Sequence, residues 1–312
     1  MAARLPVYGH TFSQNENSLF LTRMDQMHSQ LQLVQNLLST NTTSTDNGMN
    51  NTKFAQTHMM EAIALLSEKD PVSNFTWNQE IAERNQRVAN DLVRGLNDLT
   101  VFINQKASSK SNSKIGLANE SSSVQDKINN LGGLLDEAIS ARVAKDIVNN
   151  STNQALVLAN IGNEIFYSYG QALGYPYAKL ANVIATMNIS AVSSSNMNMQ
   201  GKNRMQSMNN MNNMNHNSNK NMQAMDTKVN MINESDYQNA QAYVKQAQEI
   251  ASKYVKSPVP TNINTTSDIQ SQLNKILSQL ETTINSKGSF STVMNLIHLQ
   301  LHPKLIANYK IS

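Results

Sequence analysis

The sequence predicts an all-α protein, in which antiparallel helical bundles with heptad-type seams are separated by a disordered segment rich in Met and Asn. Glycine and proline are scarce, at 11 and 6 of 312 residues, whereas β-sandwiches and α/β enzymes use more of both in turns and loops. Apolar residues recur at every third or fourth position, which is the period of a helix face. Several of these stripes follow a Ser/Thr-x-x-Glu/Gln capping box, which marks the start of a helix.

The first two predicted helices form a hairpin. Ser13-x-x-Glu16 is a capping box, and the helix after it carries one apolar stripe. That stripe consists of Phe20, Met24, Met27, Leu31, Val34 and Leu38. A polar loop over 40–51 leads to a second helix over 52–68, and because this loop is short the two helices are expected to pack antiparallel. The face of the second helix consists of Ala55, Met59, Ala62 and Leu66.

A third helix is predicted over 77–106. Pro71 ends the hairpin, and Thr76-x-x-Gln79 is the capping box of the new helix. Its stripe consists of Ile81, Asn85, Val88, Leu92, Leu99 and Phe102. A polar residue such as Asn85 within an apolar seam can fix the register between helices.

A long helical stretch follows a polar loop over 107–120. Ser122-x-x-Gln125 predicts its start, and a bend or break is expected at the Asn-Asn-Ser sequence of 149–151. Gly174-Tyr175-Pro176 ends the stretch, and a shorter helix follows to residue 187. Five aromatic residues near this end fit core packing at a corner of two helices, with the lining of a small-molecule pocket as the alternative. They are Phe166, Tyr167, Tyr169, Tyr175 and Tyr177.

The Met- and Asn-rich segment divides the chain. It contains no branched aliphatic or aromatic residue before Val229, so it cannot bury enough apolar area to offset its ordering entropy, and we predict disorder. The predicted organisation is an N-terminal tail (1–12), a helical bundle (13–192), this linker (193–232) and a three-helix unit (233–312). Within the three-helix unit, Ser235-x-x-Gln238 and Ser267-x-x-Gln270 start two helices, and Pro303 limits a third over 289–302.

Several classes of function are excluded by composition and motifs. A chain without cysteine has no disulfide framework, thiolate metal site or cysteine nucleophile. A net charge of +3, evenly spread, does not indicate nucleic-acid binding, and no apolar run reaches the ~18–20 residues of a membrane span. The nucleophile elbow, the phosphate loop, the dinucleotide fingerprint and the zinc-protease motif are all absent. Asp136 and Glu137 are interpreted as solvated surface charges, and the sequence predicts a protein that is not an enzyme.

The linker is the best candidate for specific chemistry. Its Met-x-Met and Met-x-x-Met spacings let a flexible backbone bring several thioethers to one ion, and thioether sulfur prefers Cu(I) over harder cations. The candidate ligands are Met197, Met199, Met205, Met208, Met211, Met214, His216, Met222 and Met225. Such clusters resemble the Met motifs of copper transporters and periplasmic copper carriers. The alternative is a low-complexity linker without a metal role, which is the commoner origin of such runs.

Three other metal sites are weaker alternatives. His298 and His302 are four apart, a spacing that can hold a transition metal, but two partly exposed polar residues beside a Leu stripe are the commoner case. A His/Met site between the first two helices is geometrically allowed, although Met in a seam is usually core filler. It would consist of Met24, Met27, His28, His58 and Met59. Cleavage before Tyr8 would place His10 third from a free amine, an arrangement that chelates Cu(II).

The N-terminal part of the chain also carries a resemblance. Residues 9–16 (GHTFSQNE), the heptad helix after them and residues 57–62 (THMMEA) together resemble exported helical-bundle proteins of ammonia-oxidising archaea. The resemblance ends near residue 65. It implies an extracytoplasmic helical bundle in a copper-rich setting, and it carries no catalytic residue. This chain departs from the pattern because residues 1–10 lack the apolar core of a signal peptide.

Composition favours export, because neutral polar residues and Asn-x-Ser/Thr triplets are abundant. The triplets begin at Asn41, Asn50, Asn74, Asn119, Asn149, Asn150, Asn188, Asn233 and Asn264. The sequence therefore predicts a non-enzymatic, extracytoplasmic or cell-surface protein that binds Cu(I) through the linker. The alternative is a structural or interaction protein that forms homo- or hetero-oligomers through its helical faces and has no metal role.

Overall fold

The computed structural model describes residues 15–39, 45–108, 117–183, 230–255 and 266–311, and this part of the chain is all-α, as predicted. No β-strand occurs among the described residues. The helices are α1 (Glu16–Ser39), α2 (Thr45–Ser67), α3 (Trp77–Ser108), α4 (Leu117–Arg142), α5 (Lys145–Val148), α6 (Ser151–Ala172), α9 (Glu234–Lys253), α10 (Thr266–Asn285), α11 (Phe290–Met294), the π-helix η1 (Asn295–Leu301) and α12 (His302–Tyr309). None of the helices described is long and apolar enough to cross a lipid bilayer.

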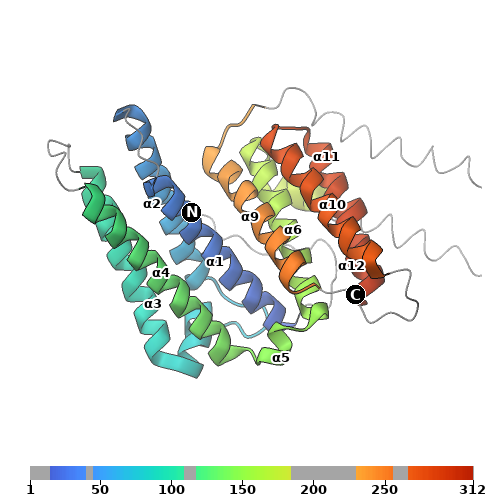
Figure 1. Cartoon of the computed structure of the whole chain (residues 1–312), viewed down its shortest axis with the longest axis horizontal. Helices are drawn as coiled ribbons and strands as arrows, with labels where there is room; N and C mark the ends of the chain where they lie inside the picture. Colours follow the sequence, from blue (N-terminus) through green and yellow to red (C-terminus); the bar gives the residue numbers. More distant parts are fainter. Residues whose placement is uncertain (1–14, 40–44, 109–116, 184–229, 256–265, 312) are drawn as a thin grey trace, which may run out of the picture.

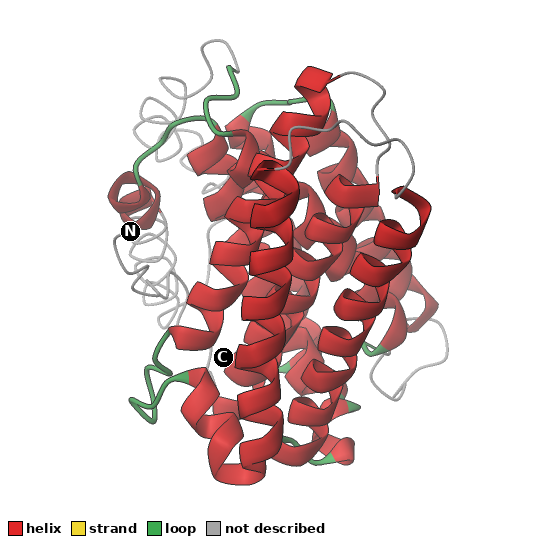
Figure 2. Cartoon of the chain, turned by 90° about the vertical axis from the view of Figure 1, so that its left-hand side faces the viewer, coloured by secondary structure: helices red, strands yellow, loops and turns green. Residues whose placement is uncertain are grey.

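Helix α1 lies at the centre of the arrangement. Helices α2, α3 and α4 lie on one side of it, and α6, α9 and the C-terminal helices lie on the other (Figure 1). In the view of Figure 2, the axes of the long helices are nearly aligned with one another. α1 packs against α2, α4, α6 and α9, and buried apolar residues from both sides form one continuous core.

The apolar stripes predicted from the sequence form this core. In α1, Phe20, Met24 and Met27 are fully buried, whereas Leu38 near the helix end is half-buried. Burial of a large apolar side chain contributes about 1.5–3 kcal/mol, so the stripes hold the helices together. The antiparallel order and the heptad geometry of the seams stay predictions.

One predicted capping box is confirmed in atomic detail. At the start of α3, Gln79 N donates to Thr76 Oγ1 at 3.2 Å, and Thr76 N donates to Gln79 Oε1 at 2.8 Å. This reciprocal pair satisfies two backbone N–H groups that have no partner inside the helix. The start of α3 is therefore set by local sequence.

Several other helix starts were predicted wrongly, and α2 begins at Thr45 instead of residue 52. Asn15 Oδ1 accepts a hydrogen bond from Ser18 N and caps α1, two residues after the predicted cap at Ser13, which lies outside the described residues. Asn233 Oδ1 accepts from Ser235 N and Asp236 N, so Ser235 lies inside α9. Asparagine is as strong an N-cap as serine, and in both helices it lies within two residues of the serine that the motif favoured. Helix α4 begins at Leu117, ahead of the predicted box at Ser122.

Two asparagines interrupt helices. Asn85 has non-helical backbone angles (φ −152°, ψ 87°), and its Oδ1 accepts from Val88 N at 3.3 Å, so it kinks α3 and caps the helical turns that follow. Its side chain also donates to Glu137 of α4 at 3.3 Å. The predicted break at 149–151 is confirmed, because α5 ends before it and Asn150 caps α6 through Thr152 N and Asn153 N.

The last helical segment differs from its prediction at Pro303. The chain does not stop there: α11 runs into the π-helix η1, and α12 continues to Tyr309. Pro303 lies where η1 passes into α12, so its missing N–H group removes one hydrogen bond from a helix that nevertheless continues. A π-turn accommodates an extra residue without ending the helix.

The described residues on both sides of the Met-rich linker contact the C-terminal end of α6. Residues 177–183 are helical, and Leu180 of that turn packs over Gly170. On the other side, Ile232 N and Asn233 N both donate to Ala172 O, at 2.7 and 3.2 Å. The predicted disorder of 193–232 concerns residues that for the most part lie outside the described part of the chain.

Candidate functional site

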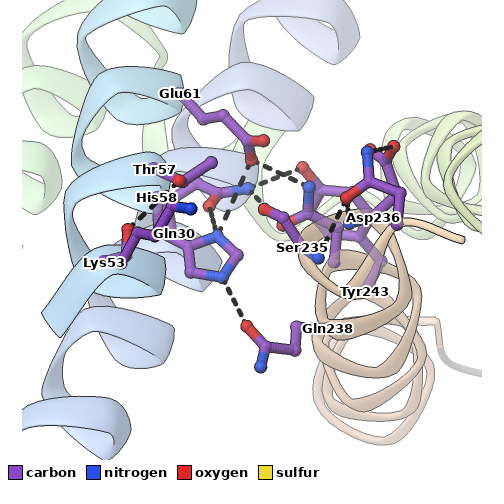
Figure 3. Close-up of polar contacts among 11 residues, drawn as sticks. Gln30, Lys53, Thr57, His58, Glu61, Ser235, Asp236, Gln238 and Tyr243 are labelled. Atoms are coloured by element: carbon purple, nitrogen blue, oxygen red, sulfur yellow. Dashed lines mark hydrogen bonds and ion pairs between the residues drawn. The ribbon is translucent and has the colours of Figure 1, made fainter. Parts of the chain in front are cut away.

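A cluster of buried polar side chains lies where α1, α2 and α9 meet and joins the two sides of the molecule (Figure 3). We call it the His58 cluster. Its members are Gln30 of α1, His58 and Glu61 of α2, and Gln238, Asn239 and Tyr243 of α9. His58 and Asn239 are fully buried and Gln30 nearly so. Polar groups at such depth are retained only when they are hydrogen-bonded.

Both ring nitrogens of His58 face side-chain oxygens (Figure 3). Nδ1 lies 2.8 Å from Gln30 Oε1, and Nε2 lies 2.9 Å from Gln238 Oε1. The Glu61 carboxylate lies 3.7 Å from Nδ1 and supplies negative charge beside the ring. Neither nitrogen is open to solvent, so the ring is engaged by protein on both edges.

Gln30 and Asn239 connect the cluster through a chain of hydrogen bonds that ends at Glu61. Gln30 Nε2 donates to Asn239 Oδ1 at 3.0 Å and contacts Tyr243 OH at 3.1 Å. Asn239 Nδ2 in turn donates to Glu61 Oε2 at 2.8 Å. These contacts fix the amide orientation of Gln30, whose oxygen must therefore accept from His58 Nδ1.

The His58 cluster can hold the three helices that carry it in one relative position. A buried network of hydrogen bonds is compatible with one arrangement of the helices that carry it, and a shifted helix would leave several groups unpaired. The cluster contains no activated nucleophile and presents no unengaged donor set to a ligand. It therefore specifies how α9 docks on α1 and α2.

The His/Met site between the first two helices, the weaker alternative to core packing, is not formed. His28 points to α4, where its Nε2 lies 3.4 Å from Asp136 Oδ1, whereas His58 points to α9. Met24, Met27 and Met59 are fully buried in the apolar core. His28 and His58 diverge because α1 packs against α4 as well as α2, and α2 also contacts α9.

A cluster of charged side chains surrounds Asp25 on α1. Burial raises the pKa of Asp25 to about 7, and the neighbouring carboxylates Glu249 and Asp136 add to the rise, whereas Lys253 opposes it. Burial also lowers the pKa of His28, and Asp136 opposes that shift. Three carboxylates from α1, α4 and α9 thus repel one another around a half-buried position.

Of the two acids predicted to be surface charges, Asp136 is exposed, as expected, whereas Glu137 is half-buried, and each has a basic partner. Asp136 pairs with His28, and Glu137 forms an ion pair with Arg87 of α3. Exposed pairs of this kind contribute little to stability.

His298 and His302 are buried, so the prediction that they are partly exposed is wrong. Their rings are 5.0 Å apart, and His302 Nε2 lies 3.1 Å from Ala159 O of α6. The His298 ring lies edge-on to Phe166 at 4.9 Å. The prediction failed because the helix continues past Pro303, which keeps both rings against α6.

Replacing Gly162 by alanine tests this packing. A Cβ atom at Gly162 would lie 3.1 Å from His302 Nε2, and overpacking of this kind is expected to lower the free energy of unfolding by about 1 kcal/mol. Gly133→Ala in α4 is the matched control: no atom lies within 4 Å of its added Cβ, so alanine is expected to stabilise that helix by about 0.5–1 kcal/mol. Urea unfolding of both variants measures the difference, and equal shifts would contradict the close approach.

The five aromatic residues near the end of α6 pack in the core, which was the favoured interpretation. Phe166 lies 5.0 Å from Phe290 of α11, and the rings of Tyr167 and Tyr177 are stacked at 4.7 Å. Tyr169 OH donates to Gly288 O at 2.5 Å. These contacts fill the corner where α6 meets the C-terminal helices.

The described part of the chain contains no cluster of His, Asp and Glu that could hold a metal ion, in 15–39, 45–108, 117–183, 230–255 or 266–311. The candidate copper ligands, Met197 to Met225 with His216, lie outside these ranges, as does His10.

Comparison with known proteins returns no relative: no family model, no curated protein and no solved structure matches the chain.

Proposed function

We propose that the protein is a non-enzymatic, exported binding protein that holds Cu(I) through the thioethers of residues 197–225. The observation that carries the proposal is the repeated Met-x-Met and Met-x-x-Met spacing within one short segment. Thioethers are soft, uncharged donors that suit Cu(I), and they remain ligands where thiols would be oxidised. A chain without cysteine and rich in neutral polar residues fits such a compartment.

The methionines of the helices support a metal role that is confined to residues 197–225. Met24, Met27, Met59 and Met294 are buried in the apolar core, so their sulfurs serve packing. Met60 is exposed on α2 and stands apart from any repeated Met spacing. The thioethers with ligand spacing are therefore those of 197–225.

The attachment of the segment also supports the proposal. Its flanking residues are fastened to the C-terminal end of α6, through Leu180 over Gly170 and through the two hydrogen bonds to Ala172 O. An insertion whose two ends lie at one place on the surface can change without strain on the body. The helical body then acts as a carrier, and its specificity for one helix arrangement comes from the His58 cluster.

A Cu(I) titration of the full chain tests the proposal. We expect one or more ions to bind at micromolar or lower free concentration, and we expect binding to be lost when the eight methionines of 197–225 are changed to leucine, which keeps size and apolarity but removes sulfur. Met60→Leu is the matched control and should bind as the wild type does. Binding weaker than millimolar, or equal binding by the leucine variant, would refute the copper role.

Sedimentation velocity on the same samples separates the second candidate function. Helix α3 exposes Val93 and Val101 on its outer side, and the alternative is self-association through such faces. A chain that binds no Cu(I) and sediments as an oligomer would establish the alternative in place of the copper role.

A further inference from the structure

The connection between α2 and α3, residues 68–76, is a compact turn held by its own backbone. Asp70 N donates to Phe75 O at 2.8 Å, and Asn74 N donates to Asp70 O at 2.9 Å. Asn74 adopts the left-handed conformation at φ 62°, which asparagine tolerates better than most residues. The turn displays two apolar side chains to solvent, Val72 and Phe75.

Two carboxyl groups lie buried beneath this turn. Asp70 is fully buried and Glu80 of α3 is 4 % exposed. Asp70 Oδ1 accepts from Val72 N at 2.9 Å, but within the described part of the chain no N–H or hydroxyl group reaches Asp70 Oδ2. The Glu80 carboxyl is held at the same turn, because it accepts from Ser73 Oγ, one residue after the Val72 N–H group that binds Asp70.

The charges around the pair do not balance if both carboxyls are ionised. Arg142 at the end of α4 contacts Glu80 Oε2 through Nε at 3.1 Å, and Ser73 Oγ donates to Glu80 Oε1 at 2.5 Å. Arg142 also lies 3.5 Å from Glu16 of α1, which is half-exposed. Of the two buried carboxyls, the guanidinium contacts Glu80, and a buried unpaired charge is strongly unfavourable.

One proton on the pair supplies the missing hydrogen-bond donor for Asp70 Oδ2 and removes the excess buried negative charge. A protonated carboxyl can donate to Asp70 Oδ2, and it reduces the buried charge to a single carboxylate against a single guanidinium. We propose that Asp70 and Glu80 share one proton, and that this proton is a latch that holds the 68–76 turn against the start of α3 and the end of α4. Loss of the proton at alkaline pH releases the turn and changes how Val72 and Phe75 are displayed.

The electrostatics agree with this geometry. Burial raises the pKa of Glu80, and the Asp70 carboxyl raises it further, whereas Ser73 and Arg142 oppose the rise. A carboxyl whose pKa is higher in the folded state stabilises the fold while it is protonated, and this contribution is lost as pH rises through the folded pKa. The adjoining charged groups are the ion pair between Arg23 of α1 and Glu68 at the start of the turn, and Lys69, whose Nζ lies 3.4 Å from Asn74 Oδ1.

The single tryptophan of the chain is a natural reporter of this latch. Trp77 follows the turn directly, its N donates to Glu68 O at 3.0 Å, and its ring is buried at 6.1 Å from Phe20. Release of the turn frees the Glu68 carbonyl and alters the surroundings of the indole. Trp77 emission therefore reports on the proton between Asp70 and Glu80.

The test follows Trp77 emission and the exchange of the Asp70 and Asn74 amides in the full chain, from about pH 5 to about pH 9. In the wild type we expect a single transition, above which amide protection falls by about tenfold per pH unit beyond the intrinsic exchange rate. In Asp70→Asn the side-chain amide supplies the missing hydrogen, so emission and protection should stay constant. Glu80→Gln should behave in the same way, which keeps the test valid if one variant fails to fold.

Glu83→Gln is the matched control, because Glu83 is an exposed carboxyl on the same helix. It should leave the transition in place. A wild type without a transition, or a transition that persists in Asp70→Asn or Glu80→Gln, would overturn the proposal.

Discussion

Replacing Gln30 by alanine is expected to lower the free energy of unfolding by about 3 kcal/mol, because three buried groups lose a partner at once and each unsatisfied group costs about 1–3 kcal/mol before relaxation. The groups are His58 Nδ1, Asn239 Oδ1 and Tyr243 OH. The chain of hydrogen bonds is interrupted at its middle, so the loss is larger than for a peripheral contact. Water can enter the space left by the side chain and recover part of the loss.

Urea unfolding at neutral pH measures the effect of Gln30→Ala. Gln32→Ala is the matched control, because Gln32 is an exposed glutamine on the same helix and its replacement should change stability by less than about 0.5 kcal/mol. If the two variants unfold at the same urea concentration, the His58 cluster does not hold α9 in place.

Replacing Asp25 by asparagine is expected to stabilise the protein at pH 8 and to leave it unchanged at pH 4. Burial and the carboxylates Glu249 and Asp136 raise the pKa of Asp25 from 3.8 to about 7. The folded state therefore binds a proton that the unfolded chain releases between these values, and stability falls as pH rises through that window. Asparagine stays neutral throughout, so it removes the loss.

The size of this gain follows from the pKa difference. A shift from 3.8 to about 7 corresponds to about 4 kcal/mol at 1.36 kcal/mol per pH unit, and solvent screening at a half-buried site reduces the expected gain to about 2 kcal/mol. Urea unfolding of wild type and variant at several pH values measures it. The exposed Asp98→Asn in α3 is the control and should show no such window; a constant stability difference between Asp25→Asn and wild type at all pH values would contradict the assignment.

Much of the fold was predictable because helix formation here rests on local signals. The stripe from Phe20 to Val34 and the box at Thr76 and Gln79 each depend on neighbours within four residues, and both appear as expected. Where the prediction failed, two local signals competed. Asn15 and Asn233 cap helices that the Ser-x-x-Glu/Gln pattern assigned to serine, because an asparagine side chain accepts from the free backbone N–H groups of a first turn as readily as serine does.

The candidate site was not predictable, because its members are brought together only by packing. Gln30 is 209 residues from Asn239, and His58 is 180 residues from Gln238. On the sequence these residues are ordinary polar positions beside an apolar stripe, and no spacing relates them. His58 was considered only as a partner of His28, and the structure turns the two rings toward different helices.

The common attachment of 177–183 and 230–233 to the end of α6 bears on how such a protein can diversify. Because both flanks meet at Gly170 and Ala172, the entropy of closing the intervening chain grows only with the logarithm of its length. Thioether motifs could be gained, lost or multiplied there by repeat slippage, while the helical carrier kept one unchanged architecture. Related chains, if compared, should then differ most in the number of methionines between these two flanks and least in the residues that receive them.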